Sequence, residues 1–256
     1  MLKGTWTICR KELNSYFSSP IAYAVMALYA LIFGFFFYSA TAYFVEASMQ
    51  SQMMGRSFPM NINEMIIRPV LMNTSVIGLF LIPMITMRLF AEEKRSGTIE
   101  LLITSPVSDL AIILGKWLAA VILYAAVVAV ASISIIYLFA WGQPDWKPLL
   151  VGFLGLTLQG AALLAIGAFI STTTRNQIIA GTAGFVISLL LWVIEWVSQF
   201  DTSTTGKVIS YLSVVTHLEP FTKGVIDLRD VVFFLSLMFL GLFLSARSLE
   251  SLRWRS

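Results

Sequence analysis

The chain has 256 residues, of which 58% are hydrophobic and only 12% carry a charge. Soluble domains contain about 45–50% apolar and about 25% charged residues, so this chain has too few charges to cover a surface facing water. Disorder is excluded as well, because it requires low hydrophobicity and high net charge, whereas the net charge here is +3. The composition therefore indicates a polytopic membrane protein.

Stretches without charged residues predict six membrane-spanning helices. Because a helix rises ~1.5 Å per residue, ~20 residues cross a hydrocarbon core of ~30 Å. The apolar blocks run continuously instead of alternating with period two, which favours an all-α polytopic protein over a β-barrel. The last span reaches full length if its helix continues past Asp230 or Arg247, whose side chains can extend to the interface. The predicted spans are residues 20–45, 69–87, 109–140, 149–172, 177–200 and 231–246.

Basic residues are distributed unequally between the two sides of these spans. Eleven of the 17 Lys and Arg residues lie on the side of the N-terminus and of the loop 88–108. The positive-inside rule then places both termini in the cytoplasm. This distribution accounts for the net charge without a nucleic acid partner. The first long apolar block begins near Pro20 and exceeds the length of a signal-peptide core, so we expect an uncleaved anchor.

Residues 1–19 show the periodicity of an amphipathic helix. At about 100° per residue, one arc collects apolar side chains and the neighbouring arc collects polar and basic ones. We expect this helix to lie in the membrane interface, with aromatic rings in the lipid and cations near the headgroups. A generic flanking anchor would show the same pattern. The candidate interfacial residues are Trp6, Arg10, Lys11, Leu13, Tyr16 and Phe17.

The cytoplasmic loop 88–108 combines a dense charge cluster with a short apolar segment at residues 98–103. A helix of that length is not stable alone, so it needs a surface on which to dock. Taken by itself, a charged loop between membrane helices is most often a solvated loop.

Motifs for catalysis and nucleotide binding are missing from the sequence. No G-x-x-x-x-G-K-[ST] pattern occurs, because Lys116 and Lys207 follow glycines but precede Trp117 and Val208. ATP phosphates therefore have no P-loop here. A single histidine and a single cysteine disfavour a dedicated zinc site. We predict no catalytic residue, no metal site and no cofactor bound by this chain.

Two ionisable residues toward the outer side have alternative interpretations. Apart from Asp109 at the first position of its span, Glu195 is the only acidic residue inside a predicted span, where a carboxylate is a candidate proton or substrate site. It lies between Trp192 and Trp196, which also fits a carboxylate in the aromatic belt at the interface. His217 in the outer segment 201–230 either senses pH or is held by hydrogen bonds to its neighbours.

The motif E-E-K-R-S-G-T-I-E-L-L at residues 92–102 resembles the signature of ABC-2 type transporter permeases. It continues with Thr104-Ser105-Pro106-Val107 and Gly115-Lys116. The whole chain is similar to the gliding-motility (GldF-like) branch and, more distantly, to NosY-type permeases of nitrous oxide reductase maturation. Further matches are R-K-E-L at residues 10–13, Tyr16-Phe17, Ser19-Pro20, Glu219-Pro220-Phe221 and K-G-V-I-D at residues 223–227.

This resemblance implies a type V exporter-like fold with an N-terminal interfacial helix at 1–19, a six-helix transmembrane domain at 20–256 and a coupling loop at 88–108. The segment 201–230 would form outer re-entrant helices; from composition alone, partial entry into the membrane is an open alternative. The coupling helix would dock on a separate ATPase subunit. The residues implied in that contact are Glu92, Glu93, Lys94, Arg95, Gly97, Thr98, Ile99, Glu100, Leu101, Leu102 and Ile103.

The resemblance also implies an assembly. Two permease halves, identical or different, would build one path in the inner membrane. Two ATPase subunits would bind ATP and magnesium, and an auxiliary membrane protein with a periplasmic domain would complete the assembly. The expected function is ATP-driven export or transmission of force to periplasmic partners. Two other interpretations stay open: an ion-coupled transporter that uses Glu195, and a membrane scaffold that recruits cytoplasmic proteins.

Overall fold

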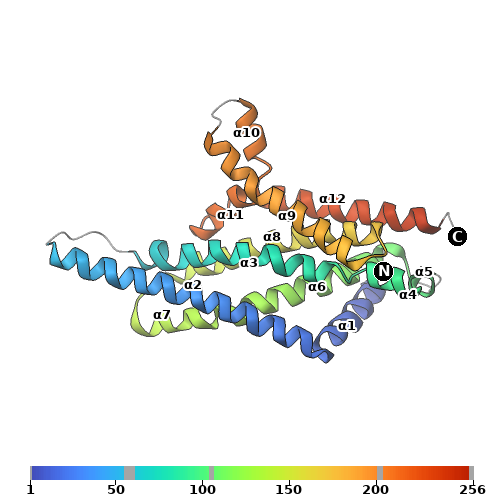
Figure 1. The fold of residues 1–256 in the computed structure, drawn as a ribbon, viewed down its shortest axis with the longest axis horizontal. Helices are drawn as coiled ribbons and strands as arrows, with labels where there is room; N and C mark the ends of the chain where they lie inside the picture. The colour runs from blue at the N-terminus through green and yellow to red at the C-terminus, as the bar shows by residue number, and fades with distance from the viewer. Residues whose placement is uncertain (1, 55–60, 104–106, 201–203, 254–256) are drawn as a thin grey trace.

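The computed structural model describes residues 2–54, 61–103, 107–200 and 204–253, and its regular structure in these ranges is helical (Figure 1). The helices in chain order are α1 (Leu2–Ser18), α2 (Pro20–Met53), the π-helix η1 (Asn63–Ile67), α3 (Arg68–Thr86), α4 (Ala91–Ser96), α5 (Ile99–Ile103), α6 (Asp109–Ala131), the 3₁₀-helix η2 (Ser132–Ile135), α7 (Ile136–Trp141), α8 (Trp146–Thr173), α9 (Gln177–Phe200), α10 (Thr204–Ser210), α11 (Val214–Thr222) and α12 (Leu228–Arg253).

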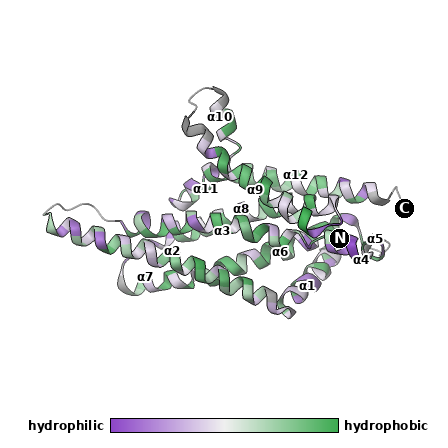
Figure 2. Cartoon of the chain, viewed as in Figure 1, coloured by the Kyte–Doolittle hydropathy of each residue, from purple (hydrophilic) through white to green (hydrophobic). Residues whose placement is uncertain are grey.

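Six helical stretches in the described ranges are long and apolar enough to cross a membrane, which confirms the predicted all-α architecture. They are Ala22–Met53, Asn63–Ser96, Asp109–Ala140, Trp146–Thr173, Gln177–Trp196 and Leu228–Ser251. Figure 2 shows that their middle parts are mainly hydrophobic and that hydrophilic residues gather around α4 and α5.

The last span is continuous past both charged residues that bracket its apolar block. Helix α12 includes Asp230 and Arg247, as the spanning length required. Asp230, in the first turn of this helix, makes a contact within the protein. Its side chain is buried, and its Oδ1 atom lies 2.6 Å from Nδ1 of His217.

Helix α8 forms the centre of the bundle, where it packs against α3, α6, α9, α11 and α12. Small residues make this contact possible, as expected for membrane helices. A Cβ atom at Gly160 would lie 2.2 Å from the Tyr124 ring of α6, and one at Gly155 would lie 2.5 Å from Cβ of Phe221 in α11. Glycine at these two positions lets large side chains of neighbouring helices lie directly on the α8 backbone.

Both termini lie at the same end of the bundle as α1, α4 and α5, and α7 lies at the opposite end (Figure 1). This end carries the charged loop, so we refer to it as the cytoplasmic end, in the orientation that the positive charges predict. At the outer side, the segment after α9 contains the short helices α10 and α11. Helix α11 packs against α8, and its Leu218 and Phe221 side chains are fully buried. The partial entry of the segment 201–230 into the membrane stays a prediction.

Candidate functional site at the cytoplasmic end

The segment after α3 folds into two short helices, α4 and α5, where the sequence indicated one helix at residues 98–103. Helix α4 takes up the charge cluster and ends at Gly97, whose φ of 74° lies in the left-handed region. Glycine adopts this conformation without the steric cost that other residues meet, which explains why α4 ends there. The chain then turns and begins α5. We call the two helices together the α4–α5 element.

A buried lysine connects the α4–α5 element to two other helices. Lys116 of α6 is only 2% exposed, and its Nζ atom lies 2.9 Å from Oε1 of Glu12 in α1 and 2.8 Å from Oε1 of Glu93 in α4. The same ammonium lies 5.6 Å from the centre of the Phe90 ring, within the range of a cation–π contact. Removal of an ammonium from water costs several kcal/mol, which the two carboxylates and the ring offset.

The triad Glu12–Lys116–Glu93 contains two carboxylates and one ammonium, so its net charge is negative. One Glu93 oxygen, Oε2, is buried without a hydrogen-bond partner in the described part of the chain. Buried polar atoms usually have a hydrogen-bond partner, so the interactions of the Glu93 carboxylate are incomplete in this arrangement. A small movement of α4 would change the distance between the Glu93 carboxylate and the Lys116 ammonium, which Glu12 also contacts.

The N-terminus of α4 is capped by a different span. The first amides of a helix have no partner within the helix and need an acceptor. Here the N–H groups of Phe90 and Ala91 both donate to Oγ of Ser171 in α8, each over 3.0 Å. Lys94 of α4 donates to the carbonyl oxygen of Thr172. Helix α4 is therefore fixed to the cytoplasmic end of α8 at both of its ends.

The predicted ATPase-contact residues divide into two groups. Glu93 and Lys94 point into the bundle and bind Lys116 and Thr172, so their charges are engaged within the chain. Ile99 packs partly against the core. The side chains of Leu102 and Ile103 lie outside the described set. The exposed residues are Glu92, Arg95, Gly97, Thr98, Glu100 and Leu101, and the apolar Leu101 side chain is 74% exposed.

Helix α1 contacts the bundle through a face that the amphipathic pattern did not indicate. Thr5, Ile8 and Cys9 are buried against α6, and the Ile8 Cβ atom lies 2.8 Å from where a Cβ of Gly115 would stand. Of the predicted interfacial residues, Trp6 and Phe17 are exposed in the way that contact with lipid requires. Arg10 and Lys11 are exposed, and Leu13 and Tyr16 are partly buried.

The sequence model of the family "ABC-2 family transporter protein" matches residues 6–245, which is most of the chain. The chain belongs to this family. No curated protein matches it. The match covers most of α1, the α4–α5 element and the first two thirds of α12, so the cytoplasmic site lies within the family's common region.

As an ABC-2 family member, the chain is a multi-pass membrane protein and a permease subunit of an ABC transporter. Members of the family are membrane subunits without a nucleotide-binding site of their own. The missing P-loop pattern in the sequence agrees with this assignment. The finer resemblance to gliding-motility or NosY-type permeases is not resolved by the family match.

One signal for the triad was present in the permease sequence. Lys116 lies inside the predicted span 109–140, and an intramembrane lysine requires a counter-ion. The sequence does not say which carboxylate fills that role, because Glu12 and Glu93 lie far from it along the chain. Ser171 carried no signal, since hydroxyl residues are common inside spans, where they also bond their own helix.

At the outer side of the permease, the structure places the two ionisable candidates apart from the cytoplasmic site. Glu195 is partly buried in the unbroken helix α9, beside the edge-to-face pair of Trp192 and Trp196, whose ring centres are 5.3 Å apart. A coupled-ion site typically lies at a broken helix near the midplane, which α9 does not provide.

His217 is a buried residue of α11 and not part of a loop. Its Nδ1 atom lies 2.6 Å from Oδ1 of Asp230, and its Nε2 atom lies 2.9 Å from the Tyr211 carbonyl oxygen. The ring stacks on Phe233, with 3.8 Å between ring centres. This residue connects α11 to α12, as the interpretation of a hydrogen-bonded histidine requires.

Proposed function

We propose that this ABC-2 permease subunit is driven by a separate ATPase that docks on the exposed side of the α4–α5 element. ATP and magnesium would bind to that partner. Closure of two ATPase subunits around ATP would move the α4–α5 elements of two permease halves, and the spans would rearrange to export a substrate or to transmit force to periplasmic partners. Each ATP-driven step must favour one arrangement over the other.

The single observation that carries this proposal is the exposed Leu101 on an element that is otherwise fixed to the bundle. The core of a protein interface is more apolar than its rim, so an exposed leucine on an anchored element is a candidate for the centre of a contact. Leu101 is 74% exposed, while its neighbour Ile99 packs against the bundle. The charged residues Glu92, Arg95 and Glu100 of the same element are also exposed, and protein interfaces combine an apolar core with a polar rim.

The fixed links of α4 explain how such a contact would act on the spans. A movement of the element would be transmitted to α6 through the contact between Glu93 and Lys116. It would be transmitted to α8 through Ser171 and through the contact of Lys94 with Thr172. The proposal also includes a second permease half, identical or different, and a location in the inner membrane. It further includes the similarity to the gliding-motility branch, with its auxiliary periplasmic protein.

The experiment is co-expression of the tagged permease with an ABC ATPase encoded beside its gene, followed by gentle extraction, mass spectrometry and an assay of vanadate-sensitive ATP hydrolysis. We expect the ATPase to co-purify in stoichiometric amount. A Leu101→Asp variant should reduce the recovered ATPase at least tenfold, because a charge would be placed in the centre of the contact.

The matched control is Ile226→Asp, since Ile226 is 55% exposed on the outer side. This variant should retain the ATPase. Equal recovery of the ATPase with both variants would place the docking site elsewhere. Recovery of the permease alone, without hydrolysis, would contradict the ATP-driven function.

A further inference from the structure

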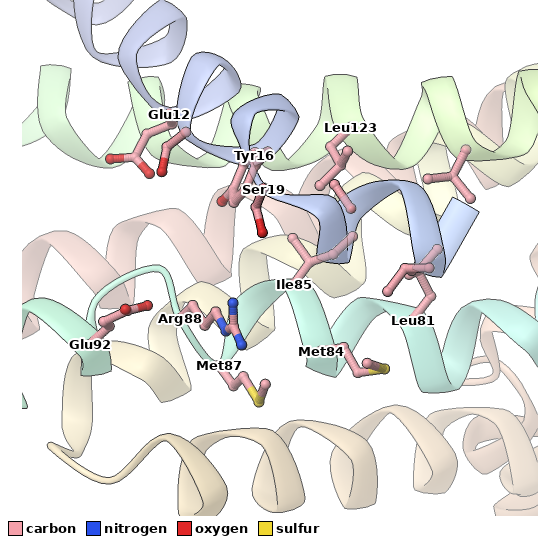
Figure 3. Close-up of a pocket in the computed structure, with 14 residues that line it drawn as sticks. Glu12, Tyr16, Ser19, Leu81, Met84, Ile85, Met87, Arg88, Glu92 and Leu123 are labelled. Atoms are coloured by element: carbon pink, nitrogen blue, oxygen red, sulfur yellow. The ribbon is translucent and has the colours of Figure 1, made fainter. Parts of the chain in front are cut away.

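A cavity of about 220 Å³ lies at the bend between the interfacial helix and the first span (Figure 3). Residues of α1, α2, α3, α4 and α6 line it, and it is partly open to the surroundings. The chain bends at Ser19, and the small side chains of Ser15, Ser19 and Ala22 line this side of the cavity and do not fill it. The volume is below the ~300–1,000 Å³ of sites for drug-sized ligands, so the cavity holds only part of a larger amphiphile, such as its headgroup and the first methylene groups of one chain.

One end of the cavity is polar and carries charges of both signs. Figure 3 shows Arg88, Glu92 and Glu12 around this end, together with the Tyr16 ring. Glu12 is engaged with Lys116. In the described ranges, no ion pair involves Arg88 or Glu92, although both line the same cavity. A cation and an anion that line one cavity without pairing with each other can each bind one charge of a zwitterion.

Tyr16 adds a hydrogen-bond donor at this end. Burial raises the pKa of its hydroxyl, and the neighbouring carboxylates of Glu12, Glu92 and Glu93 raise it further. The hydroxyl therefore stays protonated at neutral pH and can donate to an anionic or ester oxygen. The net charge of Arg88, Glu92 and the triad is negative, which disfavours a ligand whose only charge is negative.

The other end of the cavity is apolar. Leu81 and Ile85 of α3 and Leu123 and Val127 of α6 line it and are almost fully buried, while Met84 is half exposed at its edge (Figure 3). A hydrocarbon chain is the ligand that such a surface stabilises, at about 0.8 kcal/mol per buried CH₂ group. A polar end with both charges and an apolar end in one cavity match a lipid that lies with its head at the cytoplasmic surface.

We infer that this cavity binds one phospholipid whose headgroup contains a phosphate and a primary ammonium, as in phosphatidylethanolamine. The Arg88 guanidinium binds the phosphate, since its planar fork suits paired oxygens. Glu92 accepts hydrogen bonds from the ammonium, which a quaternary choline head cannot donate. One acyl chain occupies the apolar end. The bound lipid would hold α1 against α3 and so keep Glu12 beside Lys116. This inference does not depend on the ATPase.

The test is native mass spectrometry of the full chain after exchange into detergent with equal amounts of dioleoyl phosphatidylethanolamine, phosphatidylcholine and phosphatidylglycerol. We expect one retained phosphatidylethanolamine per chain. Arg88→Gln and the cavity-filling Ala22→Phe should each lower its retention at least tenfold. Glu92→Gln should keep a bound lipid but lose the preference for phosphatidylethanolamine over phosphatidylcholine. Arg175→Gln, which changes an exposed cytoplasmic arginine outside the cavity, is the control and should behave as the parent.

Each alternative result overturns the inference in a recognisable way. Equal retention of the three lipids, unchanged in Arg88→Gln and Glu92→Gln, would indicate non-specific annular lipid. Displacement of the lipid by soluble glycerophosphoethanolamine would show that the free headgroup is the ligand and that the apolar end is not used. Thermal unfolding of each variant separates loss of the site from loss of the fold, and Glu92→Gln changes only an exposed side chain.

Discussion

The Nζ atom of Lys116 lies 2.8 Å from Oε1 of Glu93, so the charge cluster of the cytoplasmic loop is bound to the third span by an ion pair that is almost closed to water. Lys116 also binds Glu12, which brings the interfacial helix into the same cluster. Helices α1, α4 and α6 thus meet at one ammonium.

Replacement of Lys116 by methionine should strongly destabilise the permease. Two partly buried carboxylates, Glu12 and Glu93, would lose their counter-ion, and the loss of one partner of a buried pair typically costs about 3–5 kcal/mol. The measurement is thermal unfolding in detergent. Lys147→Met, at an exposed lysine of α8, is the matched control. A triple variant with Glu12→Gln and Glu93→Gln should recover part of the loss, and equal stability of Lys116→Met and the parent would refute the role of the triad.

Replacement of Ser171 by alanine should loosen α4 while it leaves the bundle intact. The N–H groups of Phe90 and Ala91 would lose their shared acceptor, and the loss of a helix cap costs about 1 kcal/mol. Hydrogen–deuterium exchange should therefore be faster at the start of α4 by about fivefold. In Ser96→Ala, which removes a hydroxyl at the exposed end of the same helix, these amides should exchange at the parent rate.

Replacement of Gly160 by alanine should destabilise the contact between α8 and α6. A Cβ atom there would lie 2.2 Å from the Tyr124 ring, so the helices would have to separate, at a cost of about 1–3 kcal/mol. Gly34→Ala in α2 is the control, because nothing lies within 4 Å of its Cβ position. That change should be neutral or stabilising, since alanine is the better helix former. Equal melting temperatures for the two variants would contradict the close packing on α8.

Acid should weaken the outer connection between α3 and α11. The Lys223 ammonium lowers the pKa of Glu219 through a hydrogen bond, and Arg68 lowers it further. The folded carboxylate thus ionises more readily than the unfolded one, whose pKa is about 4.3. Its stabilisation is present above that pH and is lost as the pH falls through the lower folded value.

Because Arg68 and Glu219 are about one third exposed and Lys223 is about half exposed, the effect should be below about 1 kcal/mol. Unfolding followed by tryptophan fluorescence between pH 7 and pH 3 measures it. Glu219→Gln should flatten the decline in stability at acid pH. Glu46→Gln, at an exposed position of α2, should leave the decline as in the parent.

The hydropathy of the sequence predicted the number and order of the spans, because each helix must cover the membrane core with apolar residues. The same argument explains why α12 had to continue past Asp230 and Arg247. It did not predict the partners of charged groups, since an ion pair such as Lys116–Glu93 depends on how distant segments pack. Helix α1 shows the same limit, because an apolar arc does not reveal that Ile8 and Thr5 face a glycine of α6.

Helix α8 contains 28 residues without interruption, which corresponds to about 42 Å at 1.5 Å per residue. Ser171 near one end accepts hydrogen bonds from the first amides of α4, and Gly155 toward the other end packs against Phe221 of α11. The cytoplasmic element and the outer helix are therefore attached to one stiff rod. A tilt or axial shift of that rod would reach both faces of the membrane at the same moment, with no loop between them to absorb the motion.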